Sequence, residues 1–344
     1  IVDDTVTVWF ELENGDRAIA WTTTPWTLPA NSALAVNPTM KYVRMRHADG
    51  HVYVLAESRL AAYEKVFAGA ENLGTIMGAD LIGMHYTPIF DYYADMHAEN
   101  KSLHTVIGAD YVSDGDGAGI VHIAPAFGED DYIATRNIDA SFPIILNVDD
   151  YGNFDESVTD WAGENIFVAN PKIIDWLKQS GRLVQKAQHK HSYPFGPRSH
   201  EKLIYRATDA WYIDVPRIRD RVVEITKNDT TWTSAGNRFM SWIEGARPWG
   251  ISRNRFWGVP LPIWERDGEY KVFGSIAELE EFFGTKIDDL HRPTLDKLEK
   301  DGWKRITDVL DCWVESGSMP FARLHYPFEN KDAFVATFPA DYII

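Results

Sequence analysis

Three adjacent threonines, Thr22, Thr23 and Thr24, stand where a strand-like segment ends, and Pro25 follows them directly. Proline cannot continue a helix, and it biases the residue before it toward an extended backbone. Three neighbouring hydroxyls cannot all face the same way. At least one should therefore point into any cavity beside the strand end, where backbone N–H groups would join it. An ordinary Thr-rich strand end with solvated hydroxyls is the alternative, and this motif alone leaves it open.

A second stretch, GAGIVHIAPAFGEDDY at 117–132, combines glycine, histidine and carboxylates. Gly117 and Gly119 permit a close backbone approach, and alternation along the expected strand puts His122 on one of its faces. Past Pro125 the chain turns into the acidic run 129–131. A lone strand histidine is usually structural, and acidic residues favour a helix N-terminus in any case. The spacing by itself therefore does not select a catalytic function.

The elements that must position these residues are mainly short strands over 1–187. TVTVWFEL at 5–12 leads in, and Asp49-Gly50 between KYVRMRH and HVYVLA predicts a tight hairpin. Asn170-Pro171 predicts a helix start, with an apolar stripe at 173, 174 and 177 and an end at Gly181. This mixture indicates a β-barrel-like module with peripheral helices in a mixed α+β fold.

The remainder of the chain changes character. Residues 188–264 are basic and rich in Trp and Tyr, and 265–307 read as a small helical insertion. In that insertion Ser275 and Glu278 form a capping box for a helix ending near Gly284, and a second helix is expected over 294–302. Residues 308–344 predict two buried strands with a loop between them, as in a truncated, Rossmann-like α/β segment.

Composition narrows the possible functions. The single Cys312 excludes an internal disulfide framework and a cysteine-clustered zinc site, which fits a reducing compartment. No apolar run approaches the roughly 20 residues that cross a bilayer, so we expect no membrane partner. The net charge of −17 argues against a nucleic-acid partner, but 182–256 hold 14 Lys and Arg against 7 Asp and Glu. That basic stretch predicts phosphate contacts or, equally well on charge alone, a solvated face.

The two motifs resemble those of isoleucyl-tRNA synthetases, and the resemblance covers nearly the whole chain. It rests on TTTPWTLP and GIVHIAPAFGEDDY, followed in family order by HSYPF, LIYRA, ISRNRFWG, DVLDCW, SGSMP, LHYPFEN and FPADYI. Valyl and leucyl relatives typically carry Arg after the paired threonines. The resemblance implies an inserted editing (connective-peptide) domain over 1–187 and a return into catalytic-domain segments over 188–264. With Ile1 first and an apolar end, we expect a fragment of a longer protein.

By motif position, the resemblance implies editing roles for particular residues. Thr22, Thr23 and Thr24 would contact the terminal ribose and the ester, His122 would limit side-chain size, and Asp131 would hold the substrate's α-ammonium. Substrate-binding support is implied for Trp26 and Asn31. Ala118 departs from the family, where Thr is common.

The implied reaction is hydrolysis of mischarged Val-tRNA-Ile by direct attack of water, because no covalent nucleophile pattern is present. The parent enzyme would attach isoleucine to tRNA-Ile with ATP and Mg²⁺, but the fragment lacks the HIGH and KMSKS signatures, so we expect no cofactor, metal or synthetic activity in it. The expected partners are the tRNA-Ile 3′ end carrying valine and the rest of the synthetase. A cytoplasmic monomer is expected. A catalytically silent tRNA-binding or docking module stays the alternative, and an esterase is disfavoured because no G-x-S-x-G motif occurs.

Overall fold

A computed structural model describes residues 1–229 and 236–341. The chain divides into two compact units, Ile1–Ala207 and Thr208–Ile344, and each is described here by itself. In the described part of the chain, no helix combines the length and the apolar character that a membrane crossing requires. The expected domain limits at 187, 264 and 307 stay predictions.

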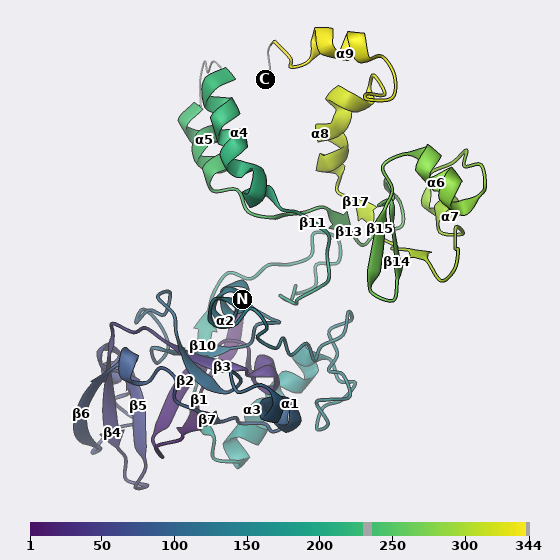
Figure 1. The fold of residues 1–344 in the computed structure, drawn as a ribbon. Coiled ribbons are helices and arrows are strands. Elements are labelled where there is room, and N and C mark those ends of the chain that lie inside the picture. Colours follow the sequence, from purple (N-terminus) through teal and green to yellow (C-terminus); the bar gives the residue numbers. More distant parts are fainter. Residues whose placement is uncertain (230–235, 342–344) are drawn as a thin grey trace. The chain divides into compact units, whose positions relative to one another are not determined.

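Unit 1 is a mixed α/β structure built on one curled ten-stranded sheet. The strand path runs β6-β4-β5-β2-β9-β3-β8, and β1 joins it by pairing with β2, β7 and β10. Figure 1 shows β4, β5 and β6 side by side at one end of this sheet. Its elements, including three 3₁₀ helices (η), are β1 Val2–Leu12, β2 Arg17–Thr22, η1 Pro25–Ala30, β3 Ala33–Val36, β4 Lys41–Arg46, β5 Val52–Ala56, η2 Glu57–Tyr63, β6 Glu71–Met77, η3 Gly78–Asp80, β7 Tyr86–Thr87, α1 Ala94–Glu99, β8 Thr105–Gly108, β9 Ile120–Ile123, α2 Glu129–Ile138, α3 Ile166–Gln179 and β10 Leu183–Lys190.

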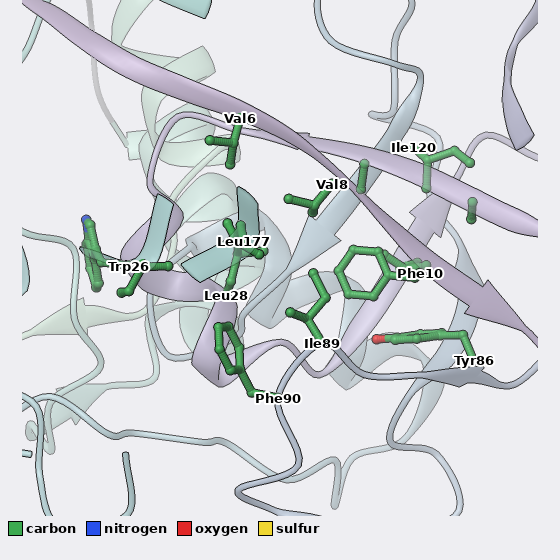
Figure 2. Packing of buried hydrophobic residues seen from close by; sticks show 14 of the residues in the cluster. Val6, Val8, Phe10, Trp26, Leu28, Tyr86, Ile89, Phe90, Ile120 and Leu177 are labelled. Carbon is green, nitrogen blue, oxygen red and sulfur yellow. The ribbon is translucent and has the colours of Figure 1, made fainter. Parts of the chain in front are cut away.

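Strand β1 is covered on both faces, so it lies inside the unit. Its apolar residues Val6, Val8 and Phe10 enter the largest core cluster, together with residues of η1, β7 and α3 (Figure 2). Trp9, on the opposite face, packs in a second cluster with β4, β5 and η2. Because successive strand residues face opposite sides, one strand serves two cores. This burial holds the neighbouring strand β2, which ends at Thr22, in a fixed position.

The predicted turn at Asp49-Gly50 and the predicted close backbone approach at Gly119 are both confirmed. Strands β4 and β5 pair antiparallel around the Asp49-Gly50 turn, where Gly50 has φ +86°. Gly119 has φ +76°, and a Cβ on it would lie 2.3 Å from the Cβ of Ala56. The backbone N–H of Ala56 donates to the Ala118 carbonyl, so β5 approaches this loop as closely as glycine allows.

The helix expected to start at Asn170-Pro171 starts earlier. Helix α3 begins at Ile166, with Asn165 as the cap whose side chain accepts from the Phe167 N–H, and Pro171 lies inside it. The prediction was wrong because two Asx residues precede the apolar stripe and the first one caps the helix. Asn170 instead accepts a hydrogen bond from the backbone N–H of Trp26, which fastens η1 to α3. The buried stripe and the end at Gly181 are confirmed.

Unit 2 consists of short helices and small sheets, and every strand pair described in it is antiparallel. Its core is a cluster that contains Trp264 of β14 and Leu279 of α6. The Rossmann-like character of this part stays a prediction. The elements are β11 Tyr212–Ile213, α4 Val215–Asp229, α5 Gly236–Glu244, β12 Trp249–Gly250, β13 Ser252–Arg253, β14 Ile263–Arg266, β15 Glu269–Val272, α6 Ile276–Phe283, α7 Arg292–Leu295, β16 Lys304–Arg305, β17 Val309–Leu310, α8 Cys312–Ala322 and α9 Lys331–Thr337.

Of the three local predictions in unit 2, one is confirmed and two fail in part or in full. The capped helix is confirmed, since Ser275 accepts from the Glu278 N–H and Gly284 ends α6 at φ +68°. The helix expected over 294–302 is wrong, because α7 ends at Leu295. Of the two buried strands expected over 308–344, the described residues form only the first, as the short β17. Asp311 ends it by capping α8, where its side chain accepts from the Trp313 N–H. Residues 342–344 of that expectation lie outside the described part.

Candidate functional site

The threonine run closes β2 with a bend. Thr22, its last residue, is buried, and its hydroxyl accepts a hydrogen bond from the Thr24 N–H at 3.0 Å. The Thr22 and Thr24 hydroxyl oxygens lie 3.3 Å apart, while Thr23 between them is half-buried. Pro25 then starts η1. The bend therefore turns two of the three hydroxyls toward each other instead of leaving them solvated.

His122 lies on β9 opposite Leu34 of β3 and is only 6% exposed. Its Nε2 is 3.0 Å from the Thr27 hydroxyl, and its Nδ1 is 2.8 Å from Nδ2 of Asn31. The Thr27 hydroxyl in turn lies 3.3 Å from that of Thr24. Burial lowers the pKa of His122 to about 3, so the imidazole is neutral at physiological pH. Polar contacts thus join the histidine to the threonine run through η1.

Asp131 lies in the first turn of α2, the next element in the chain after β9, which carries His122. One of its carboxylate oxygens accepts a hydrogen bond from the Ala124 N–H at 2.8 Å. Burial raises the pKa of Asp131 to about 6, the nearby Asp130 adds to the rise, and the Ala124 N–H opposes it. The carboxylate is therefore largely ionised at neutral pH, but in surroundings that favour its protonated form. A cationic ligand would relieve this cost.

Strand pairing brings the two motifs to one edge of the sheet. Strands β2 and β9 are parallel neighbours with Trp21 opposite Val121, about a hundred residues apart in the chain. Because they run the same way, Thr22–Thr24 and the residues after Val121 leave the sheet at the same end. Asp131 is tied to that end through Ala124. All five residues expected to be catalytic are therefore on, or bonded to, adjacent strand ends.

Trp26 and Asn31, expected to support substrate binding, are both buried in η1 and the residue after it. The Trp26 ring meets Phe127 edge to face at 5.1 Å and belongs to the largest core cluster, as Figure 2 shows. The Asn31 amide contacts His122 and accepts from the Tyr86 hydroxyl at 2.7 Å. Both residues therefore pack in the segment that follows the threonines. Direct contact of either with a substrate stays a prediction.

A cavity of about 180 Å³ adjoins both motifs on the other face of β2. Its wall includes Trp21, which alternates with Thr22 along the strand, and Gly117 at the start of the second motif. None of the residues expected to be catalytic lines it. The remaining wall residues are Thr5, Thr7, Arg59, Ala62, Tyr63, Asp116, Gln185, Ala187, Gln188 and His189.

Metal-ligating residues do not gather in the described part of the chain: no three or more His, Cys, Asp or Glu side chains there could hold an ion. Cys312 is a free, exposed thiol.

Sequence reasoning missed Thr27, Tyr86 and Tyr111. Thr27 was within reach, because a hydroxyl three residues after Thr24 falls on the next turn of η1. Tyr86 carried no signal, since it comes from β7 and meets Asn31 only in the folded chain. Tyr111 is exposed at 42%, and partial burial together with the charges of Asp131 and Asp130 raises its pKa.

The family can now be stated. A family model described as tRNA synthetases class I (I, L, M and V) matches residues 10–344. The chain belongs to this family.

Individual relatives agree with the resemblance drawn from the motifs, which is confirmed. The chain is 43% identical to an isoleucine–tRNA ligase of Nocardia farcinica over 349 residues, covering 96% of this chain and 33% of that protein. It is 44% identical to one of Corynebacterium diphtheriae over 354 residues, with the same coverage. The chain therefore spans about a third of the length of these relatives. Among solved structures, the editing domain of the P. falciparum cytosolic leucyl-tRNA synthetase is 10% identical with a TM-score of 0.41, covering 55% of this chain and 100% of that one.

Proposed function

We propose that this chain carries the editing site of an isoleucine–tRNA ligase, which hydrolyses valine mistakenly attached to tRNA-Ile. The observation that carries the proposal is the parallel pairing of β2 with β9. It puts Thr22–Thr24 at the same end of the sheet as His122, which contacts Thr27, and as Ala124, whose N–H donates to Asp131. Valine is one methylene smaller than isoleucine, so a synthetic site can disfavour it by only about 1–3 kcal/mol of binding free energy. This family is itself an established example of that limit on discrimination by size. A second, hydrolytic site removes the product that is too small.

Asp131 would hold the α-ammonium of the attached valine. Its carboxylate is half-buried and its pKa is raised to about 6, so an ammonium ligand restores the electrostatic compensation that the free site lacks. One of its oxygens already accepts from the Ala124 N–H, which fixes the carboxyl group in orientation. Binding at this point places the ester carbonyl at a set distance from the strand ends.

Water would attack the ester carbonyl directly. The carbon–oxygen bond to the terminal ribose breaks, the ribose oxygen takes a proton, and free valine and tRNA-Ile leave. The hydroxyls of Thr22 and Thr24 lie 3.3 Å apart and are available with nearby N–H groups to steady the developing oxyanion. The site would therefore accelerate hydrolysis by positioning the ester and stabilising the developing charge, without a covalent intermediate.

His122 would form the wall that excludes isoleucine. Because its pKa is lowered to about 3, it adds no positive charge that would repel the substrate ammonium. Both ring nitrogens are engaged by Thr27 and Asn31, which leaves the imidazole no free nitrogen for general-base chemistry. Its role is then steric.

For the whole protein we propose ATP-dependent attachment of isoleucine to tRNA-Ile, in the cytoplasm, with ATP and Mg²⁺ serving the synthetic site and no cofactor serving this chain. The partners of the chain are the 3′ end of Val-tRNA-Ile and the rest of the synthetase.

A catalytically silent tRNA-binding or docking module is the second candidate, and the basic stretch 182–256 favours it. A deacylation assay with intact Val-tRNA-Ile and the full chain at high concentration separates the two. Asp131→Ala should lose most of the hydrolysis, whereas Asp130→Ala, one residue away and exposed, should keep it. Wild-type activity in Asp131→Ala would refute the assignment of the site, and a wild-type chain that binds tRNA without hydrolysing the ester would support the silent module.

A further inference from the structure

A buried row of hydrogen bonds leads from β7 to His122. The Tyr86 hydroxyl donates to Oδ1 of Asn31 at 2.7 Å, and Nδ2 of Asn31 lies 2.8 Å from Nδ1 of His122. The other ring nitrogen of His122 lies 3.0 Å from the hydroxyl of Thr27. Tyr86, Asn31, Thr27 and His122 are all at least nine-tenths buried, so water does not compete for these bonds.

The donors and acceptors of this row allow one arrangement. Two contacts hold the Asn31 amide in its present orientation: Nδ2 donates to the Ala33 carbonyl at 3.1 Å, and Oδ1 accepts from the Tyr86 hydroxyl. Reversing the amide would set its oxygen against the Ala33 carbonyl and would take away the acceptor of the Tyr86 hydroxyl, so both contacts contribute to the preference. Nδ1 of His122 therefore accepts, and the ring proton is on Nε2, which donates to Thr27. The Thr27 hydroxyl passes its own hydrogen to the Thr24 carbonyl at 2.9 Å.

Tyr86 is the fixed end of the row. Its backbone pairs with Leu12 of β1, and its N–H donates to the His104 carbonyl. The ring meets Phe10 edge to face at 5.3 Å. Burial raises the pKa of Tyr86 well above its usual value, so the hydroxyl keeps its proton and always donates. The tyrosine thus supplies Asn31 with a donor whose position and protonation do not change.

We propose that Tyr86 is a positioning residue that acts through Asn31 to hold His122 in the Nε2–H tautomer and in one ring orientation, and that it thereby sets the selectivity of the editing site. The second half of this inference rests on the proposed function. A wall that separates two side chains differing by one methylene discriminates only if it does not move. Without the tyrosine hydroxyl, Oδ1 of Asn31 is buried with no donor, which destabilises the present orientation of the amide relative to the reversed one.

Nitrogen NMR of the full chain with labelled histidine tests the tautomer without any substrate. The His122 signals are identified by their loss in His122→Gln. The wild type should show the proton on Nε2 at pH 7. Asn31→Asp, with a carboxylate that can only accept, should move the proton to Nδ1, and Tyr86→Phe should give a mixture of the two tautomers.

Deacylation kinetics test the selectivity. Tyr86→Phe should raise the ratio of kcat/KM for Ile-tRNA-Ile to that for Val-tRNA-Ile about 3- to 10-fold, the change expected from losing one buried hydrogen bond. Tyr63→Phe is the matched control, because Tyr63 is as buried as Tyr86 and its hydroxyl also meets one side chain, that of Thr7 at 2.9 Å, instead of Asn31. The kcat/KM ratio of Tyr63→Phe for the two esters should stay at the wild-type value.

The results separate the two proposals. A wild-type His122 with its proton on Nδ1, or a Tyr86→Phe spectrum identical to the wild type, overturns the positioning role. An unchanged ratio in active Tyr86→Phe overturns its part in selectivity. If the wild type hydrolyses neither ester, the proposed function fails and the selectivity claim fails with it, while the NMR spectra still decide the tautomer.

Discussion

Replacing Asp131 by asparagine should make unit 1 more stable at pH 8 while abolishing hydrolysis. The amide keeps the size of the side chain and an oxygen that accepts from the Ala124 N–H, but it removes the half-buried charge. The pKa of Asp131 rises from 3.8 to about 6 on folding. Two pKa units correspond to about 3 kcal/mol, and partial solvent screening reduces the expected gain to roughly 1–3 kcal/mol.

The sign follows from proton binding. Between the unfolded pKa of 3.8 and the folded value of about 6, the folded chain binds more protons than the unfolded chain, so the stability of the wild type falls as pH rises through this window. The stability of Asp131→Asn should not fall in this pH window, because asparagine does not titrate. Its advantage should be largest above pH 6 and should shrink as the pH is lowered toward 4.

Urea unfolding between pH 5 and pH 8, combined with hydrogen exchange of the β9 amides, measures the difference in unit 1 itself. Asp130→Asn, at an exposed position, should lie within about 0.5 kcal/mol of the wild type throughout. An Asp131→Asn chain that is less stable than the wild type at pH 8, or a difference that does not depend on pH, would refute the reasoning.

Three further predictions concern packing and buried polar groups. Thr27→Val should lower the free energy of unfolding by about 1–3 kcal/mol, because it leaves a buried imidazole N–H without an acceptor, and Thr27→Ser should restore it in chemical denaturation. Gly119→Ala should destabilise by about 1–3 kcal/mol more than Gly163→Ala in thermal unfolding. Both glycines have positive φ, but only at 119 does a Cβ clash with β5, so equal losses would count against the clash. Asp296→Ala should cost unit 2 roughly 2–3 kcal/mol in the same assay, since it removes the carboxylate that accepts at 2.7 Å from the buried guanidinium of Arg305, and an unchanged transition would show that the pair is not stabilising.

Local sequence signals predicted the structure wherever a few neighbouring residues decide it. The Asp49-Gly50 hairpin and the helix capped by Ser275 depend on turn and cap chemistry within four residues, and both are confirmed. The errors came from competing local signals. Asn165 and Asn170 both suit a cap, and Asp311 turned an apolar segment expected to be strand into α8.

The candidate site was predictable as a set of residue types but not as an arrangement. The motifs identified the threonines, the histidine and the carboxylate, and they placed Asp131 at a helix start, as found. They did not reveal Tyr86, because nothing near it in the chain marks it as a partner of Asn31. A hydrogen bond between residues 55 positions apart leaves no periodic pattern to read.

By itself, the sequence determined the family, the chemical groups available at the site, and the turns and caps that depend on short-range geometry. The tertiary structure decided the charge states and the contacts. Parallel pairing of β2 with β9 brings the two motifs together, and burial then raises the pKa of Asp131 and lowers that of His122. Such shifts depend on desolvation and on hydrogen-bond partners from distant segments, which exist only once the chain has folded.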